Sequence, residues 1–421
     1  MKEITVAILG LGSRGHNTYG RLMKREGSGF RVVSVCDVLT EKLDIAKKYY
    51  GLSDGDCFNS EEEFFSKKRA DCLVIATQDR DHVRQADLAL KLGYDILLEK
   101  PISPSEKELK HLLKVNEKYK KNILVCHVLR YSPIFKKIKE TLDSGIIGTL
   151  VRLESIEQVT YWHQAHSFVR GNWRNEKTTS PMIMQKCCHD LDLLVYYVGS
   201  KCKSVYSQGS LEFFKKENKP EGAGSRCESC KYINNCIYSA ENLYVKRWRE
   251  DGCETKWPYD VVDISEKITE ESLRRAYQSN AYGRCVFECD NNVVDNQSLS
   301  IEFENGVFAT HTMTAFTSNG GRRLCFHGTH GEIELDEGKD LFRVSVFGKE
   351  NTVMTIDEAT ENSKDNMGHG GGDSGIIKAL YELLTGNGDN DTSIEKSVES
   401  HLIAISAEKS RKTNKPVRIK R

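Results

Sequence analysis

The chain has 421 residues, 38% of them hydrophobic, and its 61 lysines and arginines balance 61 aspartates and glutamates. This length favours two domains, and the absence of net charge argues against nucleic acid or an anionic membrane as the main partner. We find neither a run of about 18 apolar residues nor a secretory leader pattern, so we expect the 14 cysteines to lie in a reducing, cytoplasmic environment.

The first predicted strand leads into a glycine-rich turn. Ile4 to Leu9 is apolar, Gly10, Gly12 and Gly15 follow in GxGxxG spacing, and the next stretch can form a helix. Gly10 permits a tight turn, Gly12 lets the backbone approach a pyrophosphate, and Gly15 lets the helix pack on the strand. The N-terminus of the helix offers free N–H groups to phosphate. A purely structural glycine turn is the alternative.

A second apolar run, Arg31 to Cys36, ends at an acidic residue, Asp37. A carboxylate at this position accepts hydrogen bonds from the adenosine ribose and repels a 2′-phosphate, so it favours NAD over NADP. Ser13 and Arg14 lie inside the glycine turn and are further candidate cofactor contacts. Together these features predict a dinucleotide-binding unit.

Strand-like and helix-like segments then alternate as far as residue 126. The strands are expected at 71–76, 94–98 and 122–126, and the helices at 81–92 and 105–119. Such alternation predicts an α/β Rossmann domain with a doubly wound parallel sheet, over residues 1–127. Ligands of these sheets bind at the carboxyl ends of the strands. The candidate cofactor contacts in those positions are Thr77, Gln78, His82, Glu99 and Lys100.

The remaining residues, 128–421, predict an α+β domain with an open, mainly antiparallel sheet. Its strands are expected at 150–160, 282–289, 297–303, 307–316, 322–326, 332–335 and 342–347, after a helix that leads to Gly148. Residues 201–275 are polar and rich in cysteine, and we interpret them as an insertion. Helices are expected at 373–384 and 393–412, the second beginning with a Thr392/Glu395 capping box.

A lysine at the end of the fourth strand, Lys100, can hydrogen-bond a substrate hydroxyl and lower the cost of its deprotonation. A surface salt bridge is the alternative interpretation. The segments GLGSRG, ATQDRDH, EKPIS, HVLRYSP and QKCCHDLDLL occur in this order along the chain. This ordered set resembles the glucose–fructose oxidoreductase and inositol dehydrogenase family, often called Gfo/Idh/MocA.

The resemblance implies NAD(P)-dependent chemistry on the hydroxyl of a sugar, a polyol or a related compound. It implies that Lys100 is the lysine of the EKP motif and that His189 is the catalytic histidine. It also implies a homodimer or homotetramer formed through the outer sheet. Within the matched segments, Arg130, Tyr131 and Asp190 are candidate substrate contacts, and His369 lies in a histidine–glycine segment that relatives place beside the pocket.

The sequence departs from the family next to His189. Many relatives carry an aspartate four residues before the histidine, whereas this chain has Gln185 followed by Lys186. On a continuous helix, Lys186 and His189 share one face, which suggests a second catalytic cation. The alternative is that the aliphatic part of Lys186 packs on the protein while its ammonium group lies in solvent. The departure also allows redox-neutral glycoside cleavage, or rearrangement of an anhydrosugar of the sialic acid type, through a transient keto sugar.

Aromatic and basic residues precede this segment, among them Trp173 and Arg174. Aromatic rings stack on sugars while arginine fixes hydroxyls or a carboxylate, so we expect both residues in the substrate pocket. A loop folded over its own aromatics is the alternative. The pattern suits a glycoside and also an acidic sugar, and the sequence does not separate the two.

Four cysteines of the insertion, Cys227, Cys230, Cys236 and Cys253, are candidate ligands of a structural zinc. Thiols without metal are the alternative. In sum, the sequence predicts an NAD-dependent oxidoreductase that takes hydride from the hydroxyl of a small carbohydrate, with no nucleic acid or membrane partner. A redox-neutral cycle with tightly held NAD and a non-catalytic sugar or NAD sensor are the alternatives.

Overall fold

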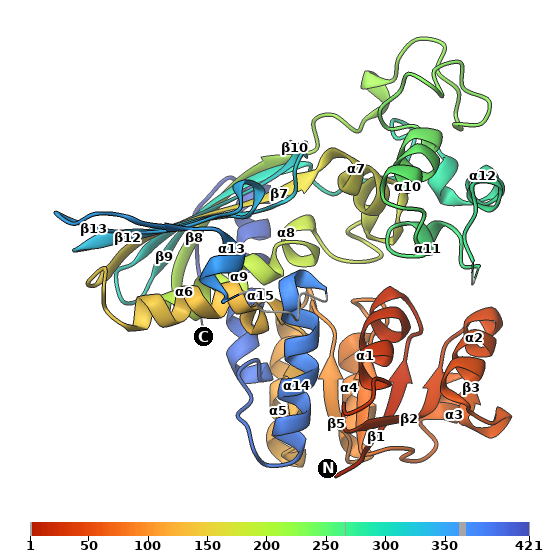
Figure 1. The fold of residues 1–421 in the computed structure, drawn as a ribbon, viewed down its shortest axis with the longest axis horizontal. Helices are drawn as coiled ribbons and strands as arrows, with labels where there is room; N and C mark the ends of the chain where they lie inside the picture. The colour runs from red at the N-terminus through yellow and green to blue at the C-terminus, as the bar shows by residue number, and fades with distance from the viewer. Residues whose placement is uncertain (1, 266, 362–367, 421) are drawn as a thin grey trace.

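A computed structural model describes residues 2–265, 267–361 and 368–420. The chain forms two sheets with a mostly helical insertion beside them (Figure 1). Among the described residues, no helix combines the length and the apolar character needed to cross a membrane.

The first sheet is the predicted Rossmann sheet. Its six strands lie in the order β3-β2-β1-β4-β5-β6, and all neighbours are parallel. The strands are β1 (Ile4–Leu9), β2 (Phe30–Cys36), β3 (Cys57–Phe58), β4 (Cys72–Ile75), β5 (Asp95–Leu98) and β6 (Ile123–Val125). The order reverses beside β1, so the carboxyl ends of β1 and β4 flank the crevice where ligands of such sheets bind.

Helices cover both faces of this sheet because its strands are apolar on both sides. They are α1 (Arg21–Met23), α2 (Thr40–Tyr50), α3 (Glu61–Phe64), α4 (His82–Lys91) and α5 (Glu106–Tyr119). Two late helices also pack here. Ile376 and Ile377 of α14 (Gly372–Leu384) join the core on one face, and Ile394 and Val398 of α15 (Ile394–Thr413) join the core on the other.

The second sheet has nine strands in the order β14-β13-β12-β11-β7-β10-β9-β8-β15. Only the pairing of β7 with β10 is parallel, so the sheet is mixed and mainly antiparallel, as the sequence predicts. The strands are β7 (Leu150–Thr160), β8 (Cys202–Ser210), β9 (Asn296–Phe303), β10 (Phe308–Thr317), β11 (Gly321–Gly328), β12 (Gly331–Asp336), β13 (Leu341–Val346), β14 (Thr352–Met354) and β15 (Val417–Arg418).

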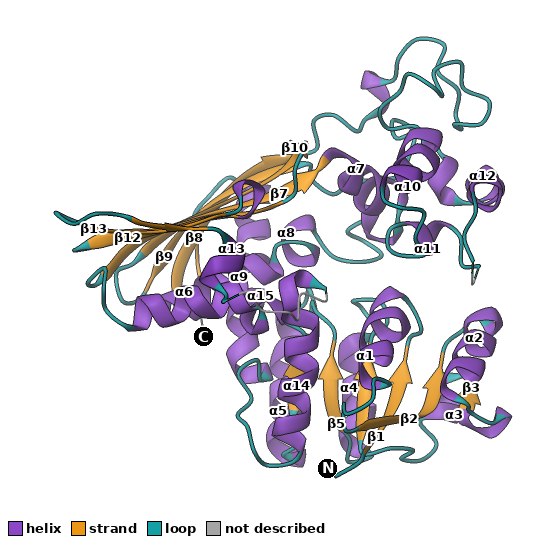
Figure 2. Cartoon of the chain, viewed as in Figure 1, coloured by secondary structure: helices purple, strands orange, loops and turns teal. Residues whose placement is uncertain are grey.

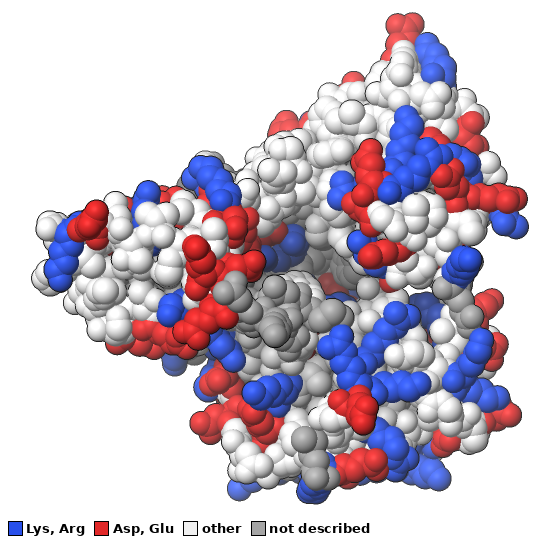
Figure 3. Space-filling view, in the orientation of Figure 1, with Lys and Arg blue, Asp and Glu red and all other residues white. Residues whose placement is uncertain are grey.

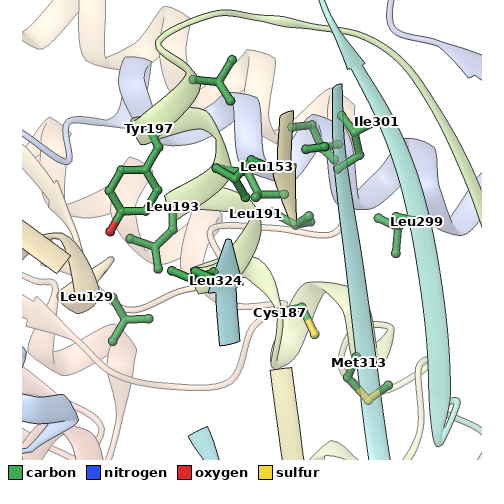
Figure 4. Packing of buried hydrophobic residues seen from close by; sticks show 14 of the residues in the cluster. Leu129, Leu153, Cys187, Leu191, Leu193, Tyr197, Leu299, Ile301, Met313 and Leu324 are labelled. Carbon is green, nitrogen blue, oxygen red and sulfur yellow. The ribbon is translucent and has the colours of Figure 1, made fainter. Parts of the chain in front are cut away.

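The core of this domain lies between one face of the sheet and helix α9 (Cys188–Val198). Leu191 and Leu194 of α9 pack against Leu153, Leu299 and their neighbours, all almost fully buried (Figure 4). The helices α6 (Pro133–Asp143), α8 (Met182–Gln185) and α13 (Ile356–Ala359) lie on the same side (Figure 2). This packing fixes the start of α9, and with it His189, relative to the sheet.

The segment between β8 and β9 forms the insertion, with a hydrophobic core of its own around Tyr244, Tyr259 and Leu273. Its helices are α10 (Arg247–Glu250), α11 (Tyr259–Val262) and α12 (Glu270–Ser279), and α7 (Tyr161–His163) lies against it. The insertion begins later than the predicted residue 201, because residues 202–210 form β8 of the sheet.

The strand predicted at 282–289 is wrong. Ala281–Gly283 form one helical turn, turns follow, and a single bridge joins Arg226 to Arg284. The apolar side chains that suggested a strand, Tyr282, Val286 and Phe287, are buried in the core of the insertion instead.

The predicted capping box of the last helix is also wrong. The cap is Ser393, whose hydroxyl accepts the backbone N–H of Lys396. Thr392 lies one residue too early for a cap: its carbonyl accepts the N–H of Val125, the last residue of β6, and its hydroxyl contacts that of Tyr131.

Candidate functional site

The glycine turn after β1 has the geometry of a phosphate-binding loop. Gly10 has φ +92°, and a Cβ there would lie 2.5 Å from the carbonyl oxygen of Ala76. A Cβ on Gly15 would lie 1.9 Å from the carbonyl oxygen of Gly10, so the helix packs on the turn only without a side chain. A Cβ on Gly12 would meet nothing within 4 Å. The turn is therefore closed at Gly10 and Gly15 and open at Gly12, where a pyrophosphate would approach.

The carboxylate of Asp37 is held beside this turn. It accepts the backbone N–H of Leu11 at 2.7 Å and that of Leu39 at 3.0 Å. Ser13 begins the helical segment Ser13–Gly20 that follows Gly12. The open turn, the helix N-terminus and the fixed carboxylate fit the diphosphate and ribose of a dinucleotide.

Arg14, a predicted cofactor contact, is held by three side chains. Its guanidinium donates to Glu99 at 2.8 Å, to Asp373 at 2.7 and 3.0 Å, and to the hydroxyl of Tyr19. Burial alone would raise the pKa of Glu99, but Arg14 and Lys100 outweigh it and hold that pKa below its usual range. Arg14 thus joins the glycine turn to the end of β5 and to the start of α14.

The other candidates at strand ends differ in exposure. Thr77 and Gln78 follow β4, where Thr77 donates to Gln85 and Gln78 is exposed. His82 is fully buried, with its ring nitrogens 2.8 Å from the carbonyl oxygen of Pro101 and 3.3 Å from that of Thr77. His82 therefore joins the loop after β4 to the loop after β5, and its ring has no exposed surface for the predicted cofactor contact.

Lys100 of the Rossmann domain contacts the second domain four residues before His189 in the chain. The Nζ atom of Lys100 donates to the backbone carbonyl of Gln185 at 2.8 Å, next to the start of α9. His189 is buried, and no hydrogen-bond partner of its Nδ1 atom lies among the described residues. Burial and then the nearby Lys100 ammonium lower the pKa of His189 well below its usual range, so the imidazole is neutral near pH 7.

His189 belongs to a row of histidine rings. The centroid of its ring lies 5.7 Å from that of His369 and 6.1 Å from that of His127, and His127 lies 5.7 Å from His401. His369, a predicted substrate contact, also bonds Asp373 through Nδ1 at 3.1 Å. The histidine–glycine segment therefore lies directly beside His189.

Lys186 and His189 do not share a helix face as predicted. Helix α8 ends at Gln185 and α9 begins at Cys188, so the chain turns between the two residues. The Nζ atom of Lys186 forms an ion pair with Glu157 of β7 at 2.8 Å. Lys186 therefore faces β7 of the second sheet, whereas the ring of His189 lies beside those of His369 and His127.

Three predicted substrate contacts are buried structural residues. Arg130 forms a two-pronged ion pair with Asp192 at 2.6 and 2.7 Å, and the hydroxyl of Tyr131 contacts Thr392. Asp190 is 1% exposed and pairs with Arg322 of β11 at 2.8 Å. All three hold elements together instead of facing the crevice.

Trp173 and Arg174 are also placed away from the expected pocket. Trp173 packs against the core of the second domain, and Arg174 forms an ion pair with Asp290 at 2.8 Å at the end of the insertion. The earlier residues Trp162 and His163 line a cavity instead. The order of motifs along the chain suggested Trp173 and Arg174, but Asp290 is distant in sequence and its pairing left no local signal.

The insertion cysteines are not gathered as a four-ligand site. Cys253 is exposed in the turn after α10, whereas Cys227 is buried and its sulfur accepts the N–H of Ala240. In the described ranges, sets of three ligand atoms within 4.8 Å of one another are Cys187–Asp190–His311 and Cys325–His327–Glu332. Neither set contains a cysteine of the insertion.

Comparison with known proteins agrees with this architecture. Residues 4–127 match the model described as oxidoreductase family, NAD-binding Rossmann fold, and residues 139–419 match its C-terminal alpha/beta domain. The protein YteT of Bacillus subtilis (strain 168) is 23% identical over 389 residues, which cover 89% of this chain and 88% of YteT. An inositol 2-dehydrogenase of Salmonella paratyphi B is 23% identical over 203 residues, 48% of this chain and 56% of that protein.

Solved structures share the fold over the whole chain. The WlbA dehydrogenase from Bordetella pertussis, in complex with NADH and UDP-GlcNAcA, has a TM-score of 0.71 at 16% identity and covers 100% of this chain and 98% of its own. A levoglucosan dehydrogenase in complex with NADH and levoglucosan has a TM-score of 0.71 at 16% identity, with 100% of both chains covered. With both domain models matched, the chain belongs to the Gfo/Idh/MocA family of oxidoreductases with an NAD-binding Rossmann domain.

Proposed function

We propose that this protein is an NAD-dependent oxidoreductase that acts on a hydroxyl of a sugar or sugar derivative. The observation that carries the proposal is the contact of Lys100, at the carboxyl end of β5, with the backbone of Gln185, four residues before the buried and neutral His189. NAD, when bound along the glycine turn, supplies the hydride acceptor.

The two side chains supply complementary chemistry. The substrate carbon loses a hydride, its hydroxyl loses a proton to the His189 imidazole, and a carbonyl forms. The Lys100 ammonium stabilises the negative charge that develops on the substrate oxygen, in a buried place where such an interaction is strong. Gln185 positions Lys100 through its backbone carbonyl.

Incubating the protein with NAD and a panel of glycosides and acidic sugars tests this function. Absorbance of NADH and the sugar products are followed together. NADH that grows in step with a keto product supports the proposal. Binding of NAD and sugar without any conversion would contradict it and would indicate a sensor.

A redox-neutral cycle is the second candidate, and one contact favours it. Asn17, in the helical segment after the glycine turn, donates to Asp260 of the insertion at 2.7 Å. This contact bridges the Rossmann domain and the insertion beside the phosphate-binding turn, as suits a cofactor that stays bound through a cycle. Sugar conversion with catalytic NAD and no net NADH would establish this candidate.

We also propose that copies of the chain associate through the outer face of the second sheet. Helices cover only one face of that sheet among the described residues (Figure 2). Phe308 and Val353 are 50% and 59% exposed on it. Light scattering on the purified protein tests this, with a dimer or tetramer expected and a smaller assembly expected for Phe308→Asp.

A structural zinc on Cys227, Cys230 and Cys236 is a separate proposal. The sulfurs of Cys227 and Cys230 each accept a backbone N–H at 3.3 Å, and the buried Arg170 lies beside Cys227 with no ion pair in the described part of the chain. Zinc would have to draw the sulfurs closer. Metal analysis tests it: zinc lost in Cys230→Ser but kept in Cys253→Ser supports the site, and protein without zinc contradicts it.

A further inference from the structure

A cavity of about 480 Å³ opens where the end of β7, the turn between β10 and β11, and the insertion meet. In the space-filling view, the molecule is hollowed between the insertion and the Rossmann domain (Figure 3). The lining residues include Trp162, His163, Lys186, Arg247 and Trp257. The volume lies in the range of small-molecule sites.

This cavity adjoins the reaction centre. Lys186, in its wall, directly follows Gln185, whose backbone carbonyl accepts the Nζ atom of Lys100 at 2.8 Å. His189 lies three residues further along the chain, at the start of α9. A ligand that reaches Lys100 and His189 can therefore extend into the cavity past Lys186.

Aromatic rings from two parts of the chain form one wall. The rings of Trp162, after β7, and Trp257, in the insertion, lie 5.3 Å apart and are tilted by 48°. His163 lies 4.8 Å from Trp257, edge to face. Both tryptophans are only partly buried, so their rings are available to the apolar C–H face of a sugar ring.

The charges in the lining are mainly positive. Lys186, Arg247 and Arg322 line the cavity together with a single carboxylate, that of Glu157. Glu157 is 2% exposed and pairs with Lys186 at 2.8 Å and with Arg322 at 2.9 Å. Its charge is therefore already balanced by two of the three cations.

Arg247 is the third cation. Its guanidinium carbon lies 4.0 Å from the centroid of the Trp162 ring, and its nearest ion-pair partner, Asp251, is 3.5 Å away. The Nε atom of Arg247 is buried and has no hydrogen-bond partner among the described residues. An arginine stacked on an aromatic ring presents its N–H edge in a fixed plane, which matches a carboxylate.

We propose that this cavity binds the acidic end of a saccharide, with its carboxylate on Arg247 and a sugar ring against Trp162 and Trp257. The inference rests on the proposed function, since it assigns a substrate class to that same site. A neutral sugar in this position would leave Arg247 with its 3.5 Å ion pair to Asp251, whereas a carboxylate would add a charged acceptor for the guanidinium.

Binding to the NAD-saturated protein tests the inference without turnover. The probes are methyl glucuronide and methyl galacturonide, each paired with its neutral methyl glycoside, which has a hydroxymethyl group in place of the carboxylate. Calorimetry and tryptophan fluorescence measure the affinities. We expect at least one acid to bind about tenfold or more tightly than its neutral partner, as a charged hydrogen bond allows.

Two variants and a control distinguish recognition of the carboxylate from stacking against the sugar ring. Arg247→Gln should remove the preference for the acid over its neutral partner, while Trp257→Leu should weaken both ligands of a pair. Arg249→Gln is the matched control, because Arg249 is on the same helix and pairs with the surface residue Glu270. Thermal unfolding checks that each variant is folded.

Equal affinity for acid and neutral partners, equal weakening of both by Arg247→Gln, or no binding of either acid would overturn the inference. Failure of the proposed function has a different signature. Selective binding of an acid without any reduction or turnover of NAD would leave the cavity assignment intact and would remove the oxidoreductase assignment.

Discussion

Gly12 and Gly15 differ in what a side chain would meet, and this difference separates cofactor binding from folding. Gly12→Ala places a Cβ in open space with ordinary φ, so the fold should keep its stability. The same Cβ stands where a pyrophosphate approaches, so we expect NAD affinity to fall about tenfold or more, since close backbone approach requires glycine. Calorimetric titration with NAD measures the effect.

Gly15→Ala is the matched change inside the turn. Its Cβ would lie 1.9 Å from the carbonyl oxygen of Gly10, so the turn must move and the free energy of unfolding should drop by about 1–3 kcal/mol. Urea denaturation measures it. If both variants lost stability equally, Gly12 would be needed for folding, like Gly15, and its assigned role in cofactor binding would be contradicted.

His401 makes stability depend on pH. Burial lowers its pKa to about 3, and its Nε2 atom accepts the backbone N–H of Ile102 at 2.8 Å, which requires the neutral ring. Below the ordinary histidine pKa of about 6.5, the unfolded chain gains a proton that the folded chain excludes. The contribution of neutral His401 to the free energy of unfolding is therefore complete above about pH 6.5. It is lost as the pH falls from about 6.5 toward the folded pKa.

The change to measure is the slope of unfolding free energy against pH. In wild type, His401 should contribute up to about 1.4 kcal/mol per pH unit in that window, and His401→Gln should flatten the slope by that amount. Denaturation at about pH 7.5, 6.5 and 5.5 gives the slopes. An unchanged slope in the variant would show that the ring is not held neutral.

Single residues were predictable where their role is local. The glycines and Asp37 lie in a motif whose chemistry depends on short spacing, whereas the roles of Lys100 and His189 were implied by the family resemblance and stay predictions. Arg130 and Arg174 were misassigned because their partners, Asp192 and Asp290, are remote in sequence. A basic residue in a motif has the same appearance whether it contacts a ligand or a buried carboxylate.

The positions of strands and helices with strong periodicity were predictable from the sequence, with small errors at their ends. Irregular segments were not predictable in this way. Residues 282–289 have the apolar content of a strand, but their side chains pack into the core of an irregular insertion. The helix expected to carry Lys186 and His189 together breaks between α8 and α9. In both places, tertiary contacts outweigh the local pattern.

The cap of α15 gives a test of this correction. Ser393→Ala removes the side-chain acceptor for the N–H of Lys396 and should cost about 1 kcal/mol of stability. Glu395→Ala, which removes the carboxylate of the expected capping box, should cost less because, among the described residues, that carboxylate accepts from Asn116 at 3.3 Å and not from the cap backbone. Chemical denaturation compares the two. A larger loss in Glu395→Ala would reinstate the capping box.

In the whole molecule, contacts between domains place the candidate chemistry. Lys100 of the Rossmann domain bonds Gln185 of the second domain, Ser180 bonds Asp79 at 2.8 Å, and Arg14 pairs with Asp373. The sequence predicts two domains but not these bonds, nor the packing of α14 on the Rossmann sheet. The insertion then adds Trp257 and Arg247 to a cavity that the second domain begins.

The most direct test of the central claim is turnover and NAD affinity measured together in Lys100→Met and His189→Gln, with a sugar that the wild-type protein converts. Both variants should still bind NAD, because the glycine turn is intact and Lys100 is one of several candidate cofactor contacts. Conversion should fall by about a hundredfold or more, as expected for loss of a positioned acid–base or charge-stabilising group. Conversion that survives in both variants, or NAD affinity that is lost with it, would contradict the roles assigned to Lys100 and His189.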